Sequence, residues 1–103
     1  MATDSATAEH ALPAAALGVL FREARSQNGW TDAPVAEAEL RELYDLLKWG
    51  PTSANSSPAR FLFVVSDAAK ARLQPHLDPS NVRKMRSAPV TAIIGYDRRF
   101  YEH

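Results

Sequence analysis

The sequence contains no cysteine, and its charges cancel, since 12 lysine and arginine residues balance 12 aspartate and glutamate residues. The lack of cysteine excludes a disulfide framework, a thiolate zinc site and a thiol nucleophile, and we expect a cytoplasmic protein. Because the formal net charge is zero, no global field would attract nucleic acid or an anionic membrane. Any partner must therefore be recognised by a local group of residues.

A leader peptide and a membrane span are also not expected. The apolar run from Ala11 to Phe21 is too short to cross a bilayer, and the residues before it include no lysine or arginine, which a secretory signal requires. We expect residues 1–10 to form a flexible tail and residues 11–103 to form one unit. A chain of 103 residues buries only about 65% of its unfolded surface, so its core should be thin.

Two amphipathic helices are predicted in the first half of the chain. The first has apolar residues at the spacing of one helical face, namely Leu17, Leu20, Phe21 and Ala24. It should begin near Pro13, which suits a first turn, and end at Gly29. The second repeats this spacing at Leu40, Leu43, Tyr44 and Leu47. Gly50 and Pro51 should end the second helix, because proline has no amide hydrogen to donate.

Two strands are predicted in the second half. The segments "FLFVVS" (61–66) and "PVTAIIGYD" (89–97) are apolar without alternation, as strands covered on both faces are. Between them we expect a short helix from Asp67 to about Gln74, a turn at Asp78-Pro79 and a second short helix. Strand, helical crossover and strand is the order found in a parallel pair, so we predict a layered α+β (α/β) fold.

Two strands of this kind leave two edges unpaired, and a two-stranded sheet is not expected to be stable alone. The sequence predicts no further strand, no internal repeat and no second domain. We therefore expect these 103 residues to be part of a larger fold.

The common signatures of catalytic, metal and nucleic-acid sites are weak. The three histidines have no second ligand at metal spacing, which favours surface positions for His10, His76 and His103. The basic run at 83–86 and the Arg98-Arg99 pair lack the aromatic platform of a nucleic-acid binder. No nucleophile elbow and no Gly-rich loop after a strand is present, so no catalytic residue is predicted.

Two polar segments remain as candidates. In "REARSQNGW" (22–30), Arg25, Ser26 and Asn28 lie where the first helix should end. A guanidinium and a hydroxyl at this place would suit a phosphate, because arginine offers a fork of donors. The alternative is a helix end with a salt-bridging arginine and an Asn-Gly turn, and spacing alone favours this alternative.

The second segment is "WGPTSANSSPARF" (49–61), which contains a dense set of short donors and acceptors, namely Thr52, Ser53, Asn55, Ser56 and Ser57. Pro51 and Pro58 restrict the backbone at both ends, so the segment is less slack than its serine content implies. Such a loop would suit a planar heterocycle with several carbonyls and ring nitrogens. Composition alone still favours a linker or a helix-to-strand turn.

Together, "ARSQNGW" and "WGPTSANSSPARFLFV" resemble the nitroreductase superfamily of FMN-dependent oxidoreductases, whose members carry an Arg-Ser phosphate grip and a later Pro-Ser/Thr-Ser-x-Asn loop. More narrowly, "LFREARSQNGW", "LYDLLKWGPTSANSSPARF" and "APVTAIIGYDRRFYEH" look like the branch called malonic semialdehyde reductase, or 3-hydroxypropanoate dehydrogenase. The resemblance runs from Leu20 to His103 and covers the first half of a family member. It implies a nitroreductase-like FMN-dependent fold, a central sheet flanked by helices, with residues 11–103 as its N-terminal part.

The resemblance also implies the cofactor-binding residues. Arg25 and Ser26 match the family's contacts to the FMN phosphate and ribityl chain, and Asn28 is at a nearby position that often holds a basic residue. The loop along the flavin is matched by Pro51, Thr52, Ser53 and Asn55, with Asn55 at the isoalloxazine edge. Family members often have Gln-Pro-Trp after that asparagine. This chain has Ser57-Pro58-Ala59 there, which fits the aldehyde reductase branch better.

For the intact protein the resemblance implies a homodimer with FMN at its interface and NAD(P)H as hydride donor. The narrower branch implies reduction of malonic semialdehyde to 3-hydroxypropanoate in pyrimidine degradation, with no nucleic acid or membrane partner. The alternative from the residues is a non-catalytic α/β fragment that acts as an interaction or dimerisation module through its open strand edges.

Overall fold

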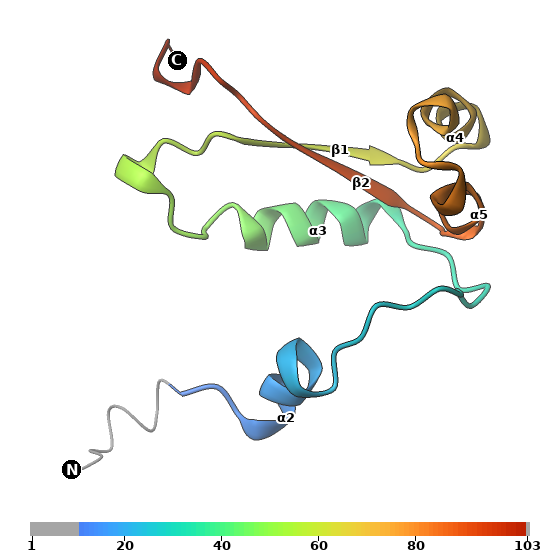
Figure 1. The fold of residues 1–103 in the computed structure, drawn as a ribbon. Helices are drawn as coiled ribbons and strands as arrows, with labels where there is room; N and C mark the ends of the chain where they lie inside the picture. The colour runs from blue at the N-terminus through green and yellow to red at the C-terminus, as the bar shows by residue number, and fades with distance from the viewer. Residues whose placement is uncertain (1–10, 103) are drawn as a thin grey trace.

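The computed structural model describes residues 11–102, in which helices lie around one two-stranded sheet (Figure 1). The tail predicted at residues 1–10, with His10, and the terminal His103 lie outside these residues. The described part is open, because its radius of gyration is 18.1 Å, against about 13 Å for a compact domain of 100 residues. None of its helices has the length and apolar character needed to cross a bilayer.

The first helix is shorter than predicted. It consists of α2 (Ala14–Leu17) and a π-helical turn, η1 (Gly18–Arg22). The predicted end at Gly29 and the helical position of Ala24 were therefore wrong. The apolar stripe has little to pack against within residues 11–102, since Phe21 is 71% exposed. Because most helical stability in proteins comes from packing of an apolar face, the additional turns lack this stabilisation within the part of the chain that the structure describes.

The second helix is confirmed as α3 (Glu37–Leu47). Its first turn is capped by Glu39, whose Oε1 accepts a hydrogen bond of 3.3 Å from the amide of Ala36. Beyond its last turn, the amide of Gly50 donates to the Leu47 carbonyl at 3.0 Å. Pro51 follows directly, so the helix ends where the sequence predicts and delivers the chain into the polar loop.

The two predicted strands are present, but they run antiparallel. β1 (Ala59–Val64) pairs with β2 (Thr91–Tyr96), and Val64 lies opposite Thr91 while Ala59 lies opposite Tyr96. The predicted parallel pair was therefore wrong. A last short turn, η4 (Phe100–Glu102), follows β2.

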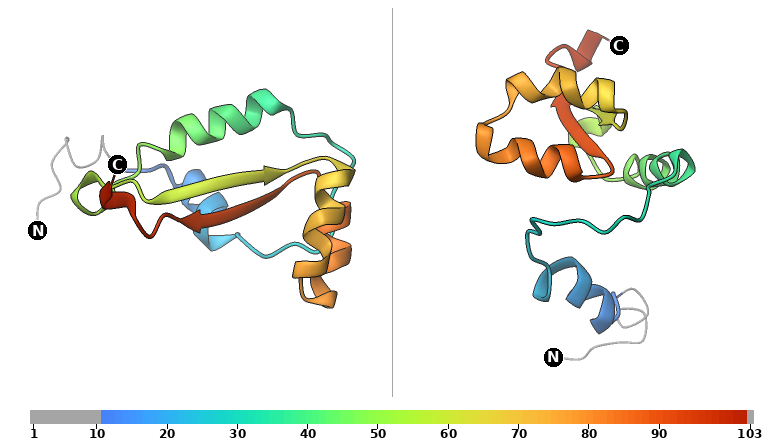
Figure 2. Two further views of the ribbon diagram at one scale, coloured as in Figure 1. Left: turned by 90° about the horizontal axis from the view of Figure 1, so that it is seen from above. Right: turned by 90° about the vertical axis from the view of Figure 1, so that its right-hand side faces the viewer.

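The connection between the strands explains their orientation. It contains two helices, α4 (Asp67–Leu73) and α5 (Pro79–Ser87), joined through a 3-10 turn, η3 (Gln74–His76). A single crossover helix returns the chain to the opposite end of a sheet, as a parallel pair requires. Here α4 leads away from the end of β1 and α5 comes back to it, so β2 starts beside the point where β1 stops (Figures 1 and 2).

Side chains of β1 alternate between the two faces of the sheet. Phe61 and Phe63 face α3, and Phe61 meets Tyr44 edge to face with ring centroids 6.2 Å apart. Leu62 lies on the opposite face, beside α4. The predicted coverage of both faces was wrong for the described residues, because Leu62 is 62% and Ile94 is 69% exposed. One helix on one face and two helices at one end leave most of the sheet open.

The buried core is small, as expected, and includes one charged side chain. Val64, Met85 and Ala88 are buried together with Lys70, which is only 7% exposed. The Nζ atom of Lys70 donates to the Ala88 carbonyl at 2.8 Å and to the Arg86 carbonyl at 3.4 Å. An ammonium group at the end of a helix satisfies carbonyls that have no partner inside the helix and interacts favourably with the helix dipole. Lys70 thus joins α4 to the end of α5.

The two helices of the connection begin with different N-caps. At the start of α4, Ser66 Oγ accepts a hydrogen bond of 3.1 Å from the Ala69 amide. At the start of α5, Asp78 Oδ1 accepts from the Ser80 hydroxyl at 2.7 Å and from the Ser80 amide at 2.9 Å. These two hydrogen bonds hold the pKa of Asp78 below its ordinary value, and the bond from the Ser80 hydroxyl has the larger effect.

Replacing each cap by alanine should therefore give different pH dependences. Ser66→Ala should lower the free energy of unfolding by about 1 kcal/mol at every pH, because its cap does not titrate. The stabilisation by Asp78 should be complete above the unfolded-state pKa of about 3.9 and should be lost as the pH falls through the lower folded-state pKa. Urea unfolding at a series of pH values measures both effects. A cost of Asp78→Ala that does not change with pH would contradict a role for the carboxylate charge.

Candidate functional site

The polar loop at residues 51–58 has a defined shape instead of the slack backbone of a linker. Its turn η2 (Ser53–Asn55) is closed by a hydrogen bond of 3.1 Å from the Asn55 amide to the Thr52 carbonyl. The Thr52 hydroxyl also accepts from the Ser57 amide at 3.0 Å. Ala54, Asn55 and Ser57 have φ values of 51°, 55° and 46°. Left-handed backbone is uncommon outside glycine, so neighbouring groups must stabilise this shape.

The loop forms one wall of a pocket of about 510 Å³. The other walls are the end of α3 and the start of β1, with the rings of Tyr44 and Phe61 among the lining groups. Two cationic side chains, Lys48 and Arg60, line the pocket, and each forms an ion pair with a carboxylate outside the lining, Lys48 with Asp45 at 3.4 Å and Arg60 with Asp97 at 3.2 Å. This pocket therefore offers aromatic surface beside two ion-paired cations.

Four of the predicted site residues belong to this loop. Pro51 and Thr52 line the pocket, whereas Ser53 and Asn55 do not. Ser53 and Asn55 are exposed, and their side chains make no hydrogen bond to another described residue. Their donors and acceptors are therefore available to a ligand at the outer side of the loop.

The other three predicted residues lie after the first helix. Arg25 Nη1 donates to the Ala24 carbonyl at 2.6 Å and to the Arg22 carbonyl at 3.4 Å, so this guanidinium lies against the end of the helix. Ser26 and Asn28 are exposed in a segment without regular structure. Among residues 11–102 Arg25 forms no salt bridge of the kind that the helix-end alternative included, and its Nε and Nη2 make no hydrogen bond there.

The two predicted segments do not come together in this chain. Figures 1 and 2 show the segment after η1 well apart from the loop, which lies at the far end of the strands. The segment is connected to α5 instead, through a hydrogen bond of 3.2 Å from Trp30 Nε1 to the Lys84 carbonyl. Among the described residues no hydrogen bond or ion pair joins Arg25, Ser26 or Asn28 to the loop.

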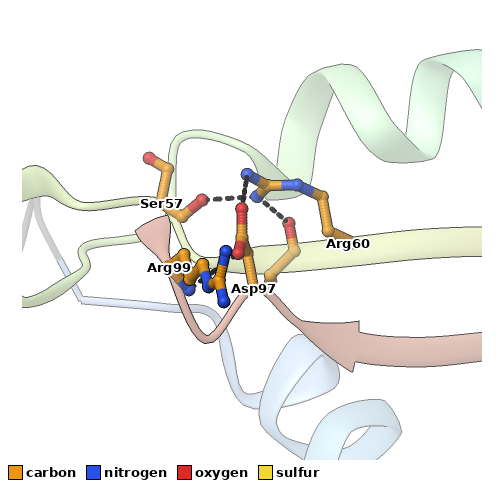
Figure 3. A network of polar contacts seen from close by, with 5 residues as sticks. Ser57, Arg60, Asp97 and Arg99 are labelled. Carbon is orange, nitrogen blue, oxygen red and sulfur yellow. Dashed lines mark hydrogen bonds and ion pairs between the residues drawn. The ribbon is translucent and has the colours of Figure 1, made fainter. Parts of the chain in front are cut away.

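Sequence reasoning missed a polar network beside the loop (Figure 3). Arg60, the second residue of β1, forms an ion pair of 3.2 Å with Asp97, which directly follows β2. In the predicted parallel pair these two residues would have been at opposite ends of the sheet. The antiparallel register brings them together, so the signal in the sequence was hidden by the wrong strand direction.

The remaining charged candidates form no second site. Within residues 11–102 no group of three or more His, Cys, Asp or Glu side chains could hold a metal ion. His76 is exposed in the turn between α4 and α5. In the basic run, Arg86 Nη1 donates to the Asp67 carbonyl at 3.4 Å, a contact between the two helices.

The chain was compared with protein-family models, curated proteins and solved structures. No protein-family model matches the chain. A curated protein of Stenotrophomonas maltophilia (strain R551-3), with the provisional name NADH dehydrogenase/NAD(P)H nitroreductase, is 60% identical over 93 residues. That match covers 90% of this chain and 47% of the relative. The chain thus spans about half the length of the curated relatives it matches.

Two solved structures share the fold. A provisionally assigned nitroreductase from Exiguobacterium sibiricum, in complex with FMN, matches with a TM-score of 0.72 and 23% identity, covering 79% of this chain and 39% of that one. A provisionally assigned nitroreductase from Desulfovibrio desulfuricans, also with FMN, matches with a TM-score of 0.66 and 25% identity, covering 77% and 45%. The predicted nitroreductase-like α+β fold is confirmed, and the names of the relatives support the nitroreductase family.

Proposed function

We propose that this chain forms part of an FMN-dependent NAD(P)H oxidoreductase of the nitroreductase family. The observation that carries the proposal is the 60% identity over 93 residues to a protein named as a nitroreductase. The same fold in two nitroreductases in complex with FMN supports it independently of sequence identity. A cytoplasmic location remains the expectation from the absence of cysteine.

The side chains present fit FMN in their chemistry. The Nε and Nη2 donors of Arg25 and the exposed Ser26 hydroxyl suit a phosphate, which arginine binds through its fork of N–H groups. The exposed side chains of Ser53 and Asn55 offer hydrogen bonds of both kinds to the edge of a heterocycle. These four residues, with Pro51 and Thr52 as loop backbone and Asn28 nearby, would hold the cofactor.

Bound FMN would supply the redox chemistry, taking a hydride from NAD(P)H and passing it to an acceptor. The residues of this chain would bind and orient the cofactor, and the loop would shield one side of it from water. No catalytic acid, base or nucleophile is assigned to this chain, whose sequence shows no recognised arrangement of such groups.

We also propose a homodimer. The phosphate-binding residues and the loop lie apart within one chain, and no contact joins them among the described residues. Two copies would allow the phosphate-binding residues of one subunit to face the loop of the other. The exposed apolar residues of the first helix, including Phe21 at 71%, would be covered in such an assembly.

The acceptor we propose is malonic semialdehyde, reduced to 3-hydroxypropanoate in pyrimidine degradation. The resemblance of three segments to that branch supports this substrate.

The second candidate is an interaction module without catalysis. It is favoured by the open sheet, since β1 and β2 pair only with each other within residues 11–102 and apolar side chains of both are exposed. An extended segment of a partner could add to a free edge through main-chain hydrogen bonds.

One measurement distinguishes the two candidates. We expect the 103-residue chain alone to bind FMN weakly or not at all, because it lacks about half of the length of its relatives. A chimera in which this chain replaces the matching segment of the Stenotrophomonas relative should bind FMN and show a flavin absorbance spectrum. A colourless chimera that folds and dimerises would contradict the oxidoreductase. A stoichiometric flavin in the chain alone would contradict the need for the second half.

A further inference from the structure

Arg60 makes three hydrogen bonds where the polar loop meets the sheet (Figure 3). Its Nη1 atom donates to the Ser57 carbonyl at 2.9 Å and to the Ala59 carbonyl at 3.0 Å. Its Nη2 atom donates to Asp97 Oδ2 at 3.2 Å. The guanidinium therefore ties the loop backbone to the end of β2 while it also lines the pocket.

Asp97 contacts the loop from the other strand. Its amide donates to the Pro58 carbonyl at 2.8 Å, and its Oδ1 atom accepts from the Arg99 amide at 2.8 Å. The Asp97 side chain is 23% exposed and that of Arg60 is 54% exposed, against 77% and 75% for Glu37 and Arg41, which pair on α3. Exposed pairs contribute little by themselves. Here each partner makes further hydrogen bonds, since Arg60 donates to the Ser57 carbonyl and Asp97 accepts from the Arg99 amide, and these bonds fix the geometry of the pair.

The backbone that this pair holds is the unusual part of the loop. Ser57 has a φ of 46° and is bound on both sides, through its amide to the Thr52 hydroxyl and through its carbonyl to Arg60. A non-glycine residue in the left-handed region persists only where surrounding contacts compensate for its cost. The hydrogen bond from Ser57 then fixes Thr52, which lines the pocket.

We infer that Arg60 and Asp97 are positioning residues of the cofactor-binding loop, and that their ion pair holds the left-handed Ser57 and the wall formed by Thr52. The inference rests on the proposed function for the claim that this loop faces the flavin. Neither residue needs to touch the cofactor. Their effect passes through the backbone of residues 57–59.

The first test measures the loop itself, without a cofactor. Arg60→Met in the chain and in the cofactor-free chimera should raise the hydrogen-exchange rate of the Ser57 amide by about tenfold, since charged hydrogen bonds are lost. Asp97→Asn should act in the same direction. Arg41→Met removes an arginine from an exposed pair on α3 and should leave Ser57 unchanged. Equal exchange at Ser57 in the Arg60 and Arg41 variants would overturn the inference.

The second test measures FMN affinity of the chimera by fluorescence titration. Arg60→Met should raise the Kd for FMN about tenfold, and Arg60→Lys should recover part of the loss, because lysine keeps the charge but not the fork. The double variant with Asp97→Asn should be no weaker than Arg60→Met alone, since both changes break one unit. Ser66→Ala lowers stability far from the loop and should leave the Kd unchanged.

The two tests separate the inference from the proposed function. A faster exchange of the Ser57 amide together with a higher Kd for FMN supports both the inference and the proposed function. Faster exchange with unchanged FMN affinity overturns the positioning of a cofactor, even though the loop is held as described. If no chimera binds FMN but Arg60→Met still raises the exchange rate of the Ser57 amide, the proposed function is overturned. The control of the loop shape by Arg60 is then still supported.

Discussion

Lys70→Ala is expected to lower the free energy of unfolding by about 2–3 kcal/mol. The side chain is 7% exposed, and its Nζ atom donates to the carbonyls of Ala88 and Arg86. Its removal leaves the buried Ala88 carbonyl without a partner and opens space in a core of only a few residues. Urea unfolding of the chain, followed by circular dichroism, measures the change.

Two further variants separate hydrogen bonding from packing at this position. Lys70→Met keeps most of the side-chain volume and should recover only the packing part of the loss. Lys84→Ala, an exposed lysine on α5, is the matched control and should change the free energy of unfolding by no more than about 0.5 kcal/mol. Equal stability of the Lys70→Ala and Lys84→Ala variants would show that the ammonium group does not stabilise α4 against α5.

Arg25→Ala is expected to weaken FMN binding by the chimera about 30-fold. The loss of charge-assisted hydrogen bonds to a phosphate costs about 2 kcal/mol, and every 1.4 kcal/mol is a tenfold change in Kd. Arg25→Lys should be intermediate, because lysine keeps the charge without the fork of donors. Flavin fluorescence titration measures the Kd.

Arg25 has a competing structural role, so the control must address it. Its Nη1 atom contacts the carbonyls of Ala24 and Arg22 at the end of the first helix. Lys48→Ala removes a cation from the pocket beside the loop, away from the segment predicted to bind the phosphate, and should weaken FMN binding less. If the Arg25→Ala and Lys48→Ala variants bind FMN with equal affinity and Arg25→Ala has a lower helix content, Arg25 stabilises the helix end and does not bind the phosphate.

The sequence was sufficient for elements whose signals are local. α3 was predicted from its apolar stripe and from Gly50 and Pro51, and the structure agrees. The break at Asp78-Pro79 was likewise correct, because an aspartate cap followed by proline specifies a helix start without reference to the rest of the chain.

Features that depend on distant groups were predicted less well. Strand direction depends on whether the connection returns to the same end, and the sequence showed two helices there without showing how they fold together. The end of the first helix depends on a surface to pack against, which the exposed Phe21 lacks here. Both errors come from tertiary contacts that no local spacing specifies.

In the candidate site, too, local features were predicted from the sequence and features that depend on distant residues were not. Pro51 and Pro58 indicated a restricted backbone, although composition alone favoured a linker or a turn, and nothing in the sequence indicated left-handed backbone at Ala54, Asn55 and Ser57. The Arg60–Asp97 pair needed the register of the sheet, because the two residues come from different strands. The assignment of Arg25, Ser26, Asn28 and the loop to FMN stays a prediction.

The antiparallel register also has a consequence for the order of folding. Val64 and Thr91 are the paired residues closest in sequence, so their loop closure costs the least entropy once α4 and α5 have formed. Pairing should then proceed toward Ala59 and Tyr96, and the Arg60–Asp97 contact should close last. By the same order it should open first in native fluctuations, so the polar loop would exchange a ligand by fraying at one end of the sheet while the helical end stays closed.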